Sequence, residues 1–425
     1  MWRVVSILTV LLGAAGARAQ VGWVLTDASF KQQSVDLVSI DDKGLVLGAD
    51  GRRMLVPLER FLEIARPASA TESAEKFALY LANGDLVRGE PIGTARDTLS
   101  WKSSALGQLD ISLRDVRAMV ARGRTAEGLE AERREDTVLM ANGDRVSGIV
   151  SSIDSGKVVM AETGATVAIA AVSHILFAAP AQKKRPAARA FRVKLTDGST
   201  FSAPGVRLEG ERLTLLLEGQ GKRDLSLAAV TVIEQTNGPV AWLSAIAADR
   251  AEHIPFLDES FPPRMDRTVE DKPIRLGKTT FARGIGVHSH TVLEWELDGG
   301  FEALRTQYAI DEGRNEKADV TVRIKLDGKT VHERENFRAG VLSDVVMIPL
   351  AGARRLTLEA AYGGGIHTQG RLNWIEPALL RKMPEQPKPP VAPAPPPPPV
   401  TKPAVTKPAT ASGPASASAP TSREN

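Results

Sequence analysis

Apolar and polar residues alternate with a period of two over much of the first half of the chain. Four segments begin with apolar residues two positions apart, namely Trp23 and Leu25, Leu79 and Leu81, Val138 and Met140, and Val193 and Leu195. This spacing predicts β-strands, because alternate side chains of a strand share one face. Tight hairpin turns are expected after three of these pairs, at Asn83-Gly84, Asn142-Gly143 and Asp197-Gly198. Ala28 replaces the glycine in the first segment, so its turn should differ.

A second pattern closes each segment. Three apolar residues recur with a spacing of three and three: Leu58, Phe61 and Ile64; Leu113, Val116 and Met119; Ile169, Val172 and Ile175; Leu227, Val230 and Ile233. The two patterns together predict four internal repeats, each with a strand, a tight turn, two or three further strands and a closing strand that bends. A unit of about 45 residues is marginal alone, so neighbouring repeats are expected to pack on one another.

The signal x-G-x-x-V-x-G is best developed from Leu81 to Gly89 and from Met140 to Gly148. It resembles the start of Sm-like or SH3-like small barrels, and this resemblance implies barrel-like repeats without any role in RNA binding. We assign the repeats to residues 20–66, 76–121, 136–179 and 190–236. A charged linker at 122–135 and a second linker at 180–189 separate them.

Residues 240–382 show the same alternation in longer strands. Leu293, Trp295 and Leu297 alternate with glutamates, and the period of two continues over 304–310, 320–324 and 356–358. Asp327-Gly328 predicts a hairpin between two strands. Because no long amphipathic helix interrupts this region, the pattern predicts a sandwich of two antiparallel sheets.

Short motifs in this second region recur together in a known order. They are RGIGVHS from Arg283, LEWEL from Leu293, YAIDE from Tyr308 and NWIEPAL from Asn373. In order and spacing they resemble the NPCBM family, a carbohydrate-binding module associated with glycosyl hydrolase family 98. The resemblance implies a galactose-binding-like β-sandwich (jelly roll) that binds glycan, with catalysis in separate domains. Many family members carry an aspartate before the tryptophan, whereas residues 367–374 contain no acid. The alternative that this module serves protein interaction alone therefore stays open.

Sugar binding requires a shelf for the apolar ring face and polar groups for the hydroxyls. We expect this site at the rim where His288 and His290 meet the loops that follow Ile310 and Tyr362. The candidate carbohydrate-binding residues are His288, His290, Asp311, Arg314, His367, Gln369, Arg371, Asn373 and Trp374. Alternation assigns Trp295 and Tyr308 to the core instead, and His288 could equally be a buried, hydrogen-bonded histidine.

Metal binding and catalysis are the alternatives for these residues. On a strand, His288 and His290 would share a face, but a stable zinc site needs three or four ligands, so no metal or cofactor is expected. Ser289 and His288 would point to opposite faces, which argues against a nucleophile and base pair. The acidic pairs Asp258-Glu259 and Asp311-Glu312 are expected at the solvated surface rather than across a hydrolytic cleft. The sequence therefore predicts no enzyme.

Composition narrows the partners. The chain has 425 residues, 54 Lys and Arg against 51 Asp and Glu, and a net charge of +3, which is not the signature of a nucleic-acid-binding protein. It has no cysteine, so disulfides and thiolate metal sites are excluded. Only 5% of residues are aromatic, which predicts small aliphatic cores.

The two ends differ from the rest. Residues 1–19 combine a short positive start, an apolar run and the cleavage signature Ala17-Arg18-Ala19, which predicts a signal peptide and a mature chain that begins at Gln20. Export to the periplasm, cell envelope or extracellular space follows, with no membrane span after cleavage. Residues 383–425 are rich in Pro, Ala, Ser and Thr and predict a disordered tail.

The sequence thus predicts an all-β chain of four barrel-like repeats, a β-sandwich and a tail. The expected function is that of an exported, non-catalytic carbohydrate-binding protein of the cell envelope. The alternative is a structural or adaptor protein whose repeats and sandwich bind envelope proteins, and a third possibility is an accessory component of a glycoside hydrolase. The sugar and the oligomeric state are left open.

Overall fold

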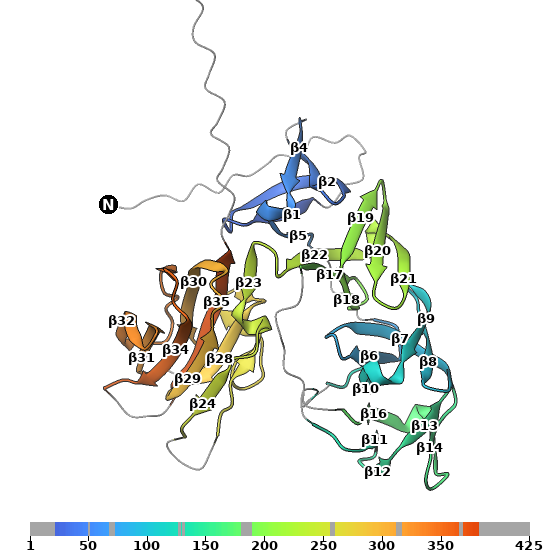
Figure 1. Ribbon diagram of the computed structural model, residues 1–425. Helices are drawn as coiled ribbons and strands as arrows, with labels where there is room; N and C mark the ends of the chain where they lie inside the picture. The colour runs from blue at the N-terminus through green and yellow to red at the C-terminus, as the bar shows by residue number, and fades with distance from the viewer. Residues whose placement is uncertain are drawn as a thin grey trace, which may run out of the picture. The chain divides into compact units, whose positions relative to one another are not determined.

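The computed structural model describes residues 22–49, 52–67, 73–125, 129, 132–179, 189–255, 260–311, 317–364 and 369–381. The regular elements of these residues are strands and short 3-10 turns (Figure 1), which confirms the all-β prediction. Within them, no helix has the length and apolar character needed to cross a membrane. The expected signal peptide, nearly all of the 180–189 linker and the expected tail lie outside the described residues.

Repeat 1 is a small barrel. It contains β1 (Trp23–Asp27), β2 (Gln32–Ile40), β3 (Gly44–Ala49), β4 (Arg52–Pro57), the 3-10 turn η1 (Leu58–Arg60) and β5 (Phe61–Ala65). Strands β1 to β4 pair in antiparallel order, and β5 returns to pair with β1. The sheet therefore rolls back on its first strand.

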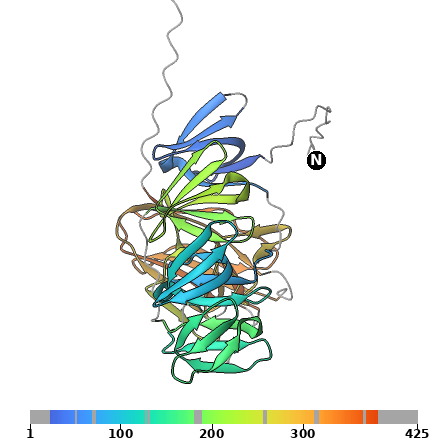
Figure 2. The ribbon, with the colours of Figure 1, turned by 90° about the vertical axis from the view of Figure 1, so that its right-hand side faces the viewer.

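The other three repeats follow the same plan, with the second strand divided in repeats 3 and 4. Figure 2 shows the strands of the repeats from a second side, coloured from blue to yellow-green along the chain. Repeat 2 contains β6 (Phe77–Leu81), β7 (Leu86–Ala95), β8 (Thr98–Ser103), β9 (Gly107–Ser112), η2 (Leu113–Asp115) and β10 (Val116–Ala121). Repeat 3 contains β11 (Asp136–Met140), β12 (Arg145–Gly148), β13 (Val150–Ile153), β14 (Lys157–Met160), β15 (Thr166–Ala168), η3 (Ile169–Ala171) and β16 (Val172–Leu176). Repeat 4 contains β17 (Ala190–Leu195), β18 (Thr200–Ala203), β19 (Gly205–Glu209), β20 (Arg212–Leu217), β21 (Gly221–Ser226), η4 (Leu227–Ala229) and β22 (Val230–Thr236).

The spacing of three and three at the end of each repeat has a structural cause. The first apolar residue opens a 3-10 turn of three residues, the second opens the closing strand, and the third lies within that strand. The third residues, Ile64, Met119, Ile175 and Ile233, are all fully buried. The closing segment is therefore a turn followed by a strand, rather than one strand that bends.

In the structure, the first repeat aligns with the others two residues further along the chain than the sequence pattern indicated. Leu25 pairs with Ile64 as Leu79 pairs with Met119, so Leu25 corresponds to Leu79. The left-handed turn position is then Phe30, with φ of 62°, where the other repeats have Gly84, Gly143 and Gly198. Ala28 is not the glycine equivalent, and the alignment failed because this turn has no glycine to mark it.

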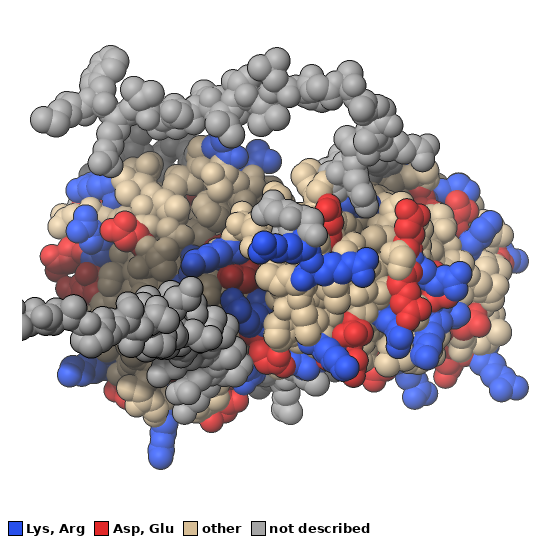
Figure 3. Space-filling model, turned by 90° about the horizontal axis from the view of Figure 1, so that it is seen from above, with Lys and Arg blue, Asp and Glu red and all other residues tan. Residues whose placement is uncertain are grey.

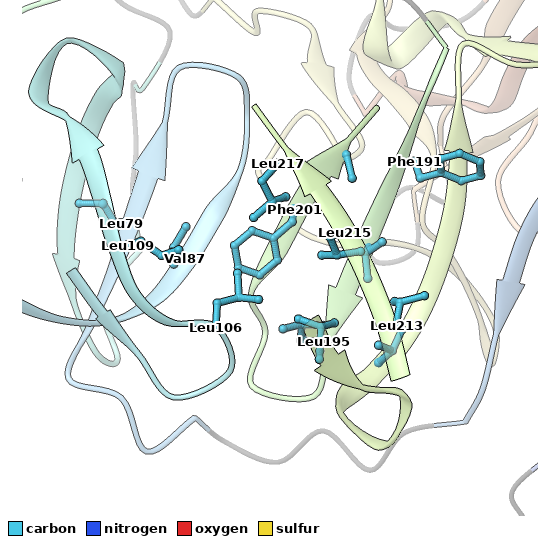
Figure 4. Close-up of a cluster of buried hydrophobic side chains, with 14 of the residues drawn as sticks. Leu79, Val87, Leu106, Leu109, Phe191, Leu195, Phe201, Leu213, Leu215 and Leu217 are labelled. Carbon is cyan, nitrogen blue, oxygen red and sulfur yellow. The ribbon is translucent and has the colours of Figure 1, made fainter. Parts of the chain in front are cut away.

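Strand pairs between repeats use equivalent positions. Ile64 of β5 faces Ile233 of β22, and Met119 of β10 faces Ile175 of β16. Repeat 1 therefore pairs with repeat 4 in the register in which repeat 2 pairs with repeat 3. A third pair, Thr200 of β18 with Leu86 of β7, joins repeats 4 and 2. The buried apolar residues form one cluster through all four repeats, and Figure 4 shows the part shared by repeats 2 and 4.

The sandwich occupies residues 240–381 and begins with β23 (Val240–Trp242), η5 (Leu243–Ala245) and β24 (Arg250–His253). Its further strands are β25 (Arg264–Met265), β26 (Ile274–Leu276), β27 (Thr279–Phe281), β28 (Gly284–His288), β29 (Thr291–Glu296), β30 (Phe301–Ile310), β31 (Val320–Leu326), β32 (Lys329–Phe337), β33 (Val346–Pro349), β34 (Arg355–Tyr362) and β35 (Arg371–Arg381). One sheet has the order β25-β28-β35-β30-β33, with β23 also on β35, and the other has the order β24-β29-β34-β31-β32.

The sandwich core consists of residues that the alternation predicted. Leu293, Trp295, Tyr308 and Leu358 are all buried there. Trp295 donates its indole N–H to the Ile246 carbonyl at 3.1 Å, and the Tyr308 hydroxyl lies 3.0 Å from Nε2 of His332. Both aromatic residues are therefore satisfied core residues, as the sequence indicated.

Residues of the sandwich also contact the repeats. Arg283 forms ion pairs with Glu234 of β22 and with Asp266, the latter at 2.9 Å. Phe30 packs its ring edge-to-face on Trp242 at 6.0 Å, and the guanidinium of Arg305 lies 4.0 Å from the centre of the Phe30 ring. The strained Phe30 turn is thus occupied by contacts with the sandwich.

Candidate functional site

The histidine rim is the end of the sandwich at which both sheets present loops. We define it by His253, Phe261, Glu270, His288, His290, Asp311, Tyr362, Gln369 and Arg371. His288 ends β28 opposite Arg371, the first residue of β35, and Ile310 pairs with Leu372 one residue further along. In the second sheet, His253 ends β24 and Tyr362 ends β34. Strands from far apart in the sequence therefore deliver these side chains to one end of the domain.

One half of the histidine rim is a group of rings. Phe261 stacks on His288 with the ring centres 4.7 Å apart, and His253 meets His288 edge-to-face at 5.8 Å. His290 lies 5.0 Å from the ring of Tyr362. All five side chains are partly exposed. The rings thus offer apolar faces at the surface of an otherwise polar rim.

Hydrogen bonds fix these rings. The Thr291 hydroxyl donates to the His288 carbonyl at 2.6 Å and lies 3.1 Å from Nδ1 of His253. Nε2 of His253 is buried and has no hydrogen-bond partner among the described residues. Burial lowers the pKa of His253 and of His288, so both rings are neutral at pH 7. Neutral rings can accept as well as donate hydrogen bonds.

The other half of the histidine rim contains charged and amide groups. Asp311 is buried, and its Oδ1 accepts a hydrogen bond from the Asn373 amide. Arg371 forms an ion pair with Glu270 at 2.8 Å, and Lys272 pairs with the same glutamate. Burial raises the pKa of Asp311 to about 6, and the neighbouring Glu270 adds to this effect while Asn373 and Arg371 oppose it. A buried carboxylate with a raised pKa is typical of functional sites.

Five of the nine candidate residues lie at the rim itself. These are His288, His290, Asp311, Gln369 and Arg371. Asn373 and Trp374 lie inside β35 and are 1% and 0% exposed, so Trp374 has no ring face open to solvent. Arg314 and His367 lie outside the described residues.

Three local expectations are wrong. His288 and His290 do not share a strand face, because β28 ends at His288 and His290 lies in the following turn with φ of 66°. That turn also brings Oγ of Ser289 to 3.4 Å from Nδ1 of His288, although neighbours on a strand would point apart. Asp311 is buried rather than solvated.

The contact of Ser289 with His288 does not create an open nucleophile. Ser289 is 1% exposed, and a Cβ added at Gly370 would lie 2.3 Å from its hydroxyl oxygen. The backbone of Gly370 therefore covers the serine. No group of three or more His, Asp or Glu side chains in the described parts of the chain could hold a metal ion.

The sequence interpretation missed four contributors to the histidine rim. They are His253, Phe261, Glu270 and Thr291. His253 and Thr291 are paired across β24 and β29, so strand register could have connected them. Phe261 precedes two prolines outside any strand, and no periodic signal marks it.

Rings and hydrogen-bonding groups that meet at one loop end of an antiparallel sandwich are a common setting for a binding site. Residues 240–380 match the model of the NPCBM/NEW2 domain, so this chain contains that domain and the resemblance seen in the sequence is confirmed.

The chain is also similar to several known proteins. A protein of Renibacterium salmoninarum that carries the name endo-alpha-N-acetylgalactosaminidase is 22% identical over 115 residues, which cover 27% of this chain and 8% of that protein. The CBM51 of Clostridium perfringens GH95, solved in complex with methyl-galactose, is 19% identical and has a TM-score of 0.30, with 33% of this chain and 99% of that one covered. The tandem CBM51 modules of the family 98 glycoside hydrolase of Streptococcus pneumoniae are 11% identical with a TM-score of 0.30, and the match covers 73% of this chain and 89% of theirs.

Proposed function

We propose that this protein is a non-catalytic binding protein whose sandwich binds glycan through the histidine rim. The observation that carries this proposal is the placement of partly exposed rings beside the polar groups of Gln369 and Arg371 at one loop end. An aromatic face can cover the apolar face of a sugar ring, while neighbouring donors and acceptors bind its hydroxyls. Each neutral hydrogen bond contributes about 1 kcal/mol net, so we expect a Kd between roughly 1 mM and 1 μM.

The binding test uses the full chain and a glycan array that includes methyl-galactose and GlcNAc. For a glycan that binds, calorimetry should show at least a tenfold weaker affinity for Phe261→Ala and for Arg371→Gln, because each removes one half of the expected contact. Val331→Ala is the matched control, because Val331 is an exposed apolar residue on β32. If folded Phe261→Ala and Arg371→Gln keep the parent affinity, the glycan site lies elsewhere.

A protein-binding role remains the second candidate, and one observation favours it. Basic and acidic side chains are interspersed over the face in Figure 3, so this face favours a partner of mixed charge, such as another protein, over a nucleic acid. An array without any glycan bound, together with a protein captured by the folded chain, would favour this adaptor role over sugar binding.

We further propose that the protein is exported and acts in the periplasm, the cell envelope or outside the cell. The support is the sequence of residues 1–19, with its short positive start, apolar run and Ala17-Arg18-Ala19. N-terminal sequencing of protein recovered outside the cytoplasm should begin at Gln20. Recovery of an exported chain that still begins at Met1 would contradict the cleavage step.

A further inference from the structure

The contact between repeats 2 and 4 is built from equivalent residues of the two repeats. Leu86 and Thr200, which pair with each other, are each the first residue of the strand after the glycine turn. The backbone N–H of Arg88 donates to Oγ of Ser199 at 3.0 Å. In return, the Ser202 N–H donates to Oδ1 of Asp85 at 2.8 Å. Because Asp85 corresponds to Ser199 and Arg88 to Ser202, the contact has local two-fold symmetry.

Repeat 3 carries the same turn in the same conformation. The Met140 N–H donates to the Asp144 carbonyl at 2.9 Å, as the Leu81 N–H donates to the Asp85 carbonyl at 2.9 Å. Nδ2 of Asn142 donates to Oδ2 of Asp144 at 2.7 Å, and the corresponding bond from Asn83 to Asp85 is 2.9 Å long. Asp144 therefore holds its Oδ2 within the turn, as Asp85 does.

The turn of repeat 3 differs from the turns of repeats 2 and 4 in its exposure to solvent. Asp85 and Ser199 are 5% and 0% exposed, because repeats 2 and 4 cover each other. Residues 141–145 and Ser147 are all exposed. Among the described strands, β12 pairs only with β11, so its outer edge is open. Repeat 3 thus presents an uncovered copy of a contact surface that is used elsewhere in the same chain.

We infer that this surface, defined by residues 141–147 and called the repeat 3 turn surface, binds a second copy of this chain. A contact with two-fold symmetry can be made by two identical repeats. Oδ1 of Asp144 would accept a hydrogen bond from the Ser147 N–H of the second copy, and the reverse bond would form at the same time.

The other three turns show why the assembly stops at a dimer. The turns of repeats 2 and 4 are used on each other, and the turn of repeat 1 carries Phe30, which contacts Trp242. Of the four turns in the described residues, the turn of repeat 3 is therefore the open one. A single two-fold surface per chain closes on itself and gives a dimer rather than a filament.

Arg145 makes the contact weak and adjustable. It occupies the position of Leu86 and Thr200, so the two Arg145 side chains of a dimer would lie opposite each other. Like charges directly opposite across paired strands are unfavourable. Replacing Arg145 with threonine, the residue of repeat 4, should therefore strengthen the dimer.

Sedimentation velocity of the full chain over a concentration series tests the inference. The apparent mass of the parent chain should rise from that of a monomer towards that of a dimer as the protein concentration increases. Asp144→Ala should lower the association constant at least about tenfold, since it removes a charged acceptor at both symmetric bonds. Asp144→Ser should keep most of it, because Ser199 shows that a hydroxyl serves at this position. Arg145→Thr should raise the constant several-fold.

Asp154→Ala is the matched control. Asp154 also caps a turn of repeat 3, where its Oδ1 accepts from the Gly156 and Lys157 N–H groups, but it lies outside the repeat 3 turn surface. Its association constant should equal that of the parent chain, and circular dichroism should show that all variants are folded. The inference is overturned if the parent chain and the Arg145→Thr variant both remain monomeric up to about 1 mM. It is also overturned if Asp144→Ala and Asp144→Ser lower the association constant equally.

Discussion

Arg283→Ala should destabilise the protein by about 3–5 kcal/mol at pH 7, because it leaves buried carboxylates without their cation. Glu63 of β5 and Glu234 of β22 face each other across the strand pair that joins repeats 1 and 4. Burial raises the pKa of Glu63, and the charge of Glu234 raises it further, whereas Lys194 and Arg283 lower it. Arg283 binds Glu234 directly, and the side chains of this ion pair are only 14% and 5% exposed.

The remaining contacts of Arg283 explain why a lysine would not replace it. One guanidinium nitrogen pairs with Glu234 and another with Asp266, so the planar fork holds two carboxylates at once. An ammonium group at this position keeps the charge but loses this geometry. We therefore expect Arg283→Lys to recover only part of the stability that Arg283→Ala loses.

Urea unfolding, followed by fluorescence and circular dichroism, measures this effect. Arg250→Ala is the control, because Arg250 and its partner Glu252 are 57% and 41% exposed and exposed ion pairs contribute little to stability. Adding Glu234→Gln to Arg283→Ala should restore stability, since it removes one of the two facing charges. If Arg283→Ala and Arg250→Ala lower the free energy of unfolding equally, the Arg283 contacts stabilise the protein no more than an exposed ion pair does.

Much of the fold could be predicted because alternation reports burial on one face of a sheet. Leu293 and Trp295 are core residues for this reason, and the three-and-three spacing marks the 3-10 turn and closing strand of each repeat. The partners of the closing strands could not be predicted, since all four strands carry the same apolar pattern. Pairing of repeat 1 with repeat 4 becomes visible only in the register of Ile64 with Ile233.

Alternation fails where both faces of a strand are covered. In the central strand β35, Trp374 faces the core, and Asn373 on the opposite face is also buried. Asn373 pairs with Gly286, and a Cβ added at that glycine would lie 2.4 Å from the Arg267 carbonyl oxygen. A chain segment therefore packs directly on this face. Residues 373 and 374 looked like rim residues in the sequence because their position in a central strand was not visible there.

The histidine rim was located correctly at the ends of particular strands, but its composition was only partly predictable. Strand ends are marked by where alternation stops, as at His288 and Tyr362. Phe261 comes from an irregular segment, and nothing in its local sequence indicates that it stacks on His288. The surroundings of Asp311 likewise include Asn373 and Arg371, which lie 62 and 60 residues away along the chain.

Asp311→Asn should make the protein more stable at pH 8, by up to about 3 kcal/mol, while it weakens any glycan binding at the histidine rim. The folded-state pKa of Asp311 is about 6, above the ordinary value of 3.8 for an aspartate, because burial disfavours the charged form. Between pH 4 and pH 6, the folded protein therefore binds more protons at this residue than the unfolded chain does. The contribution of Asp311 to stability falls as the pH rises through this window, and it stays unfavourable above pH 6.

The asparagine variant removes this penalty and keeps an oxygen that can accept from Asn373. Relative to the parent, its free energy of unfolding should therefore increase from pH 4 to pH 6 and then level off. Asp154→Asn provides a control of opposite sign, since the N–H groups of Gly156 and Lys157 lower the pKa of Asp154. A parent and Asp311→Asn variant with parallel stability curves from pH 4 to pH 8 would rule out this penalty. Asp311 therefore lowers stability at a position beside Arg371 in the histidine rim. Residues that lower stability are often kept where they serve binding, which agrees with a binding role for this rim.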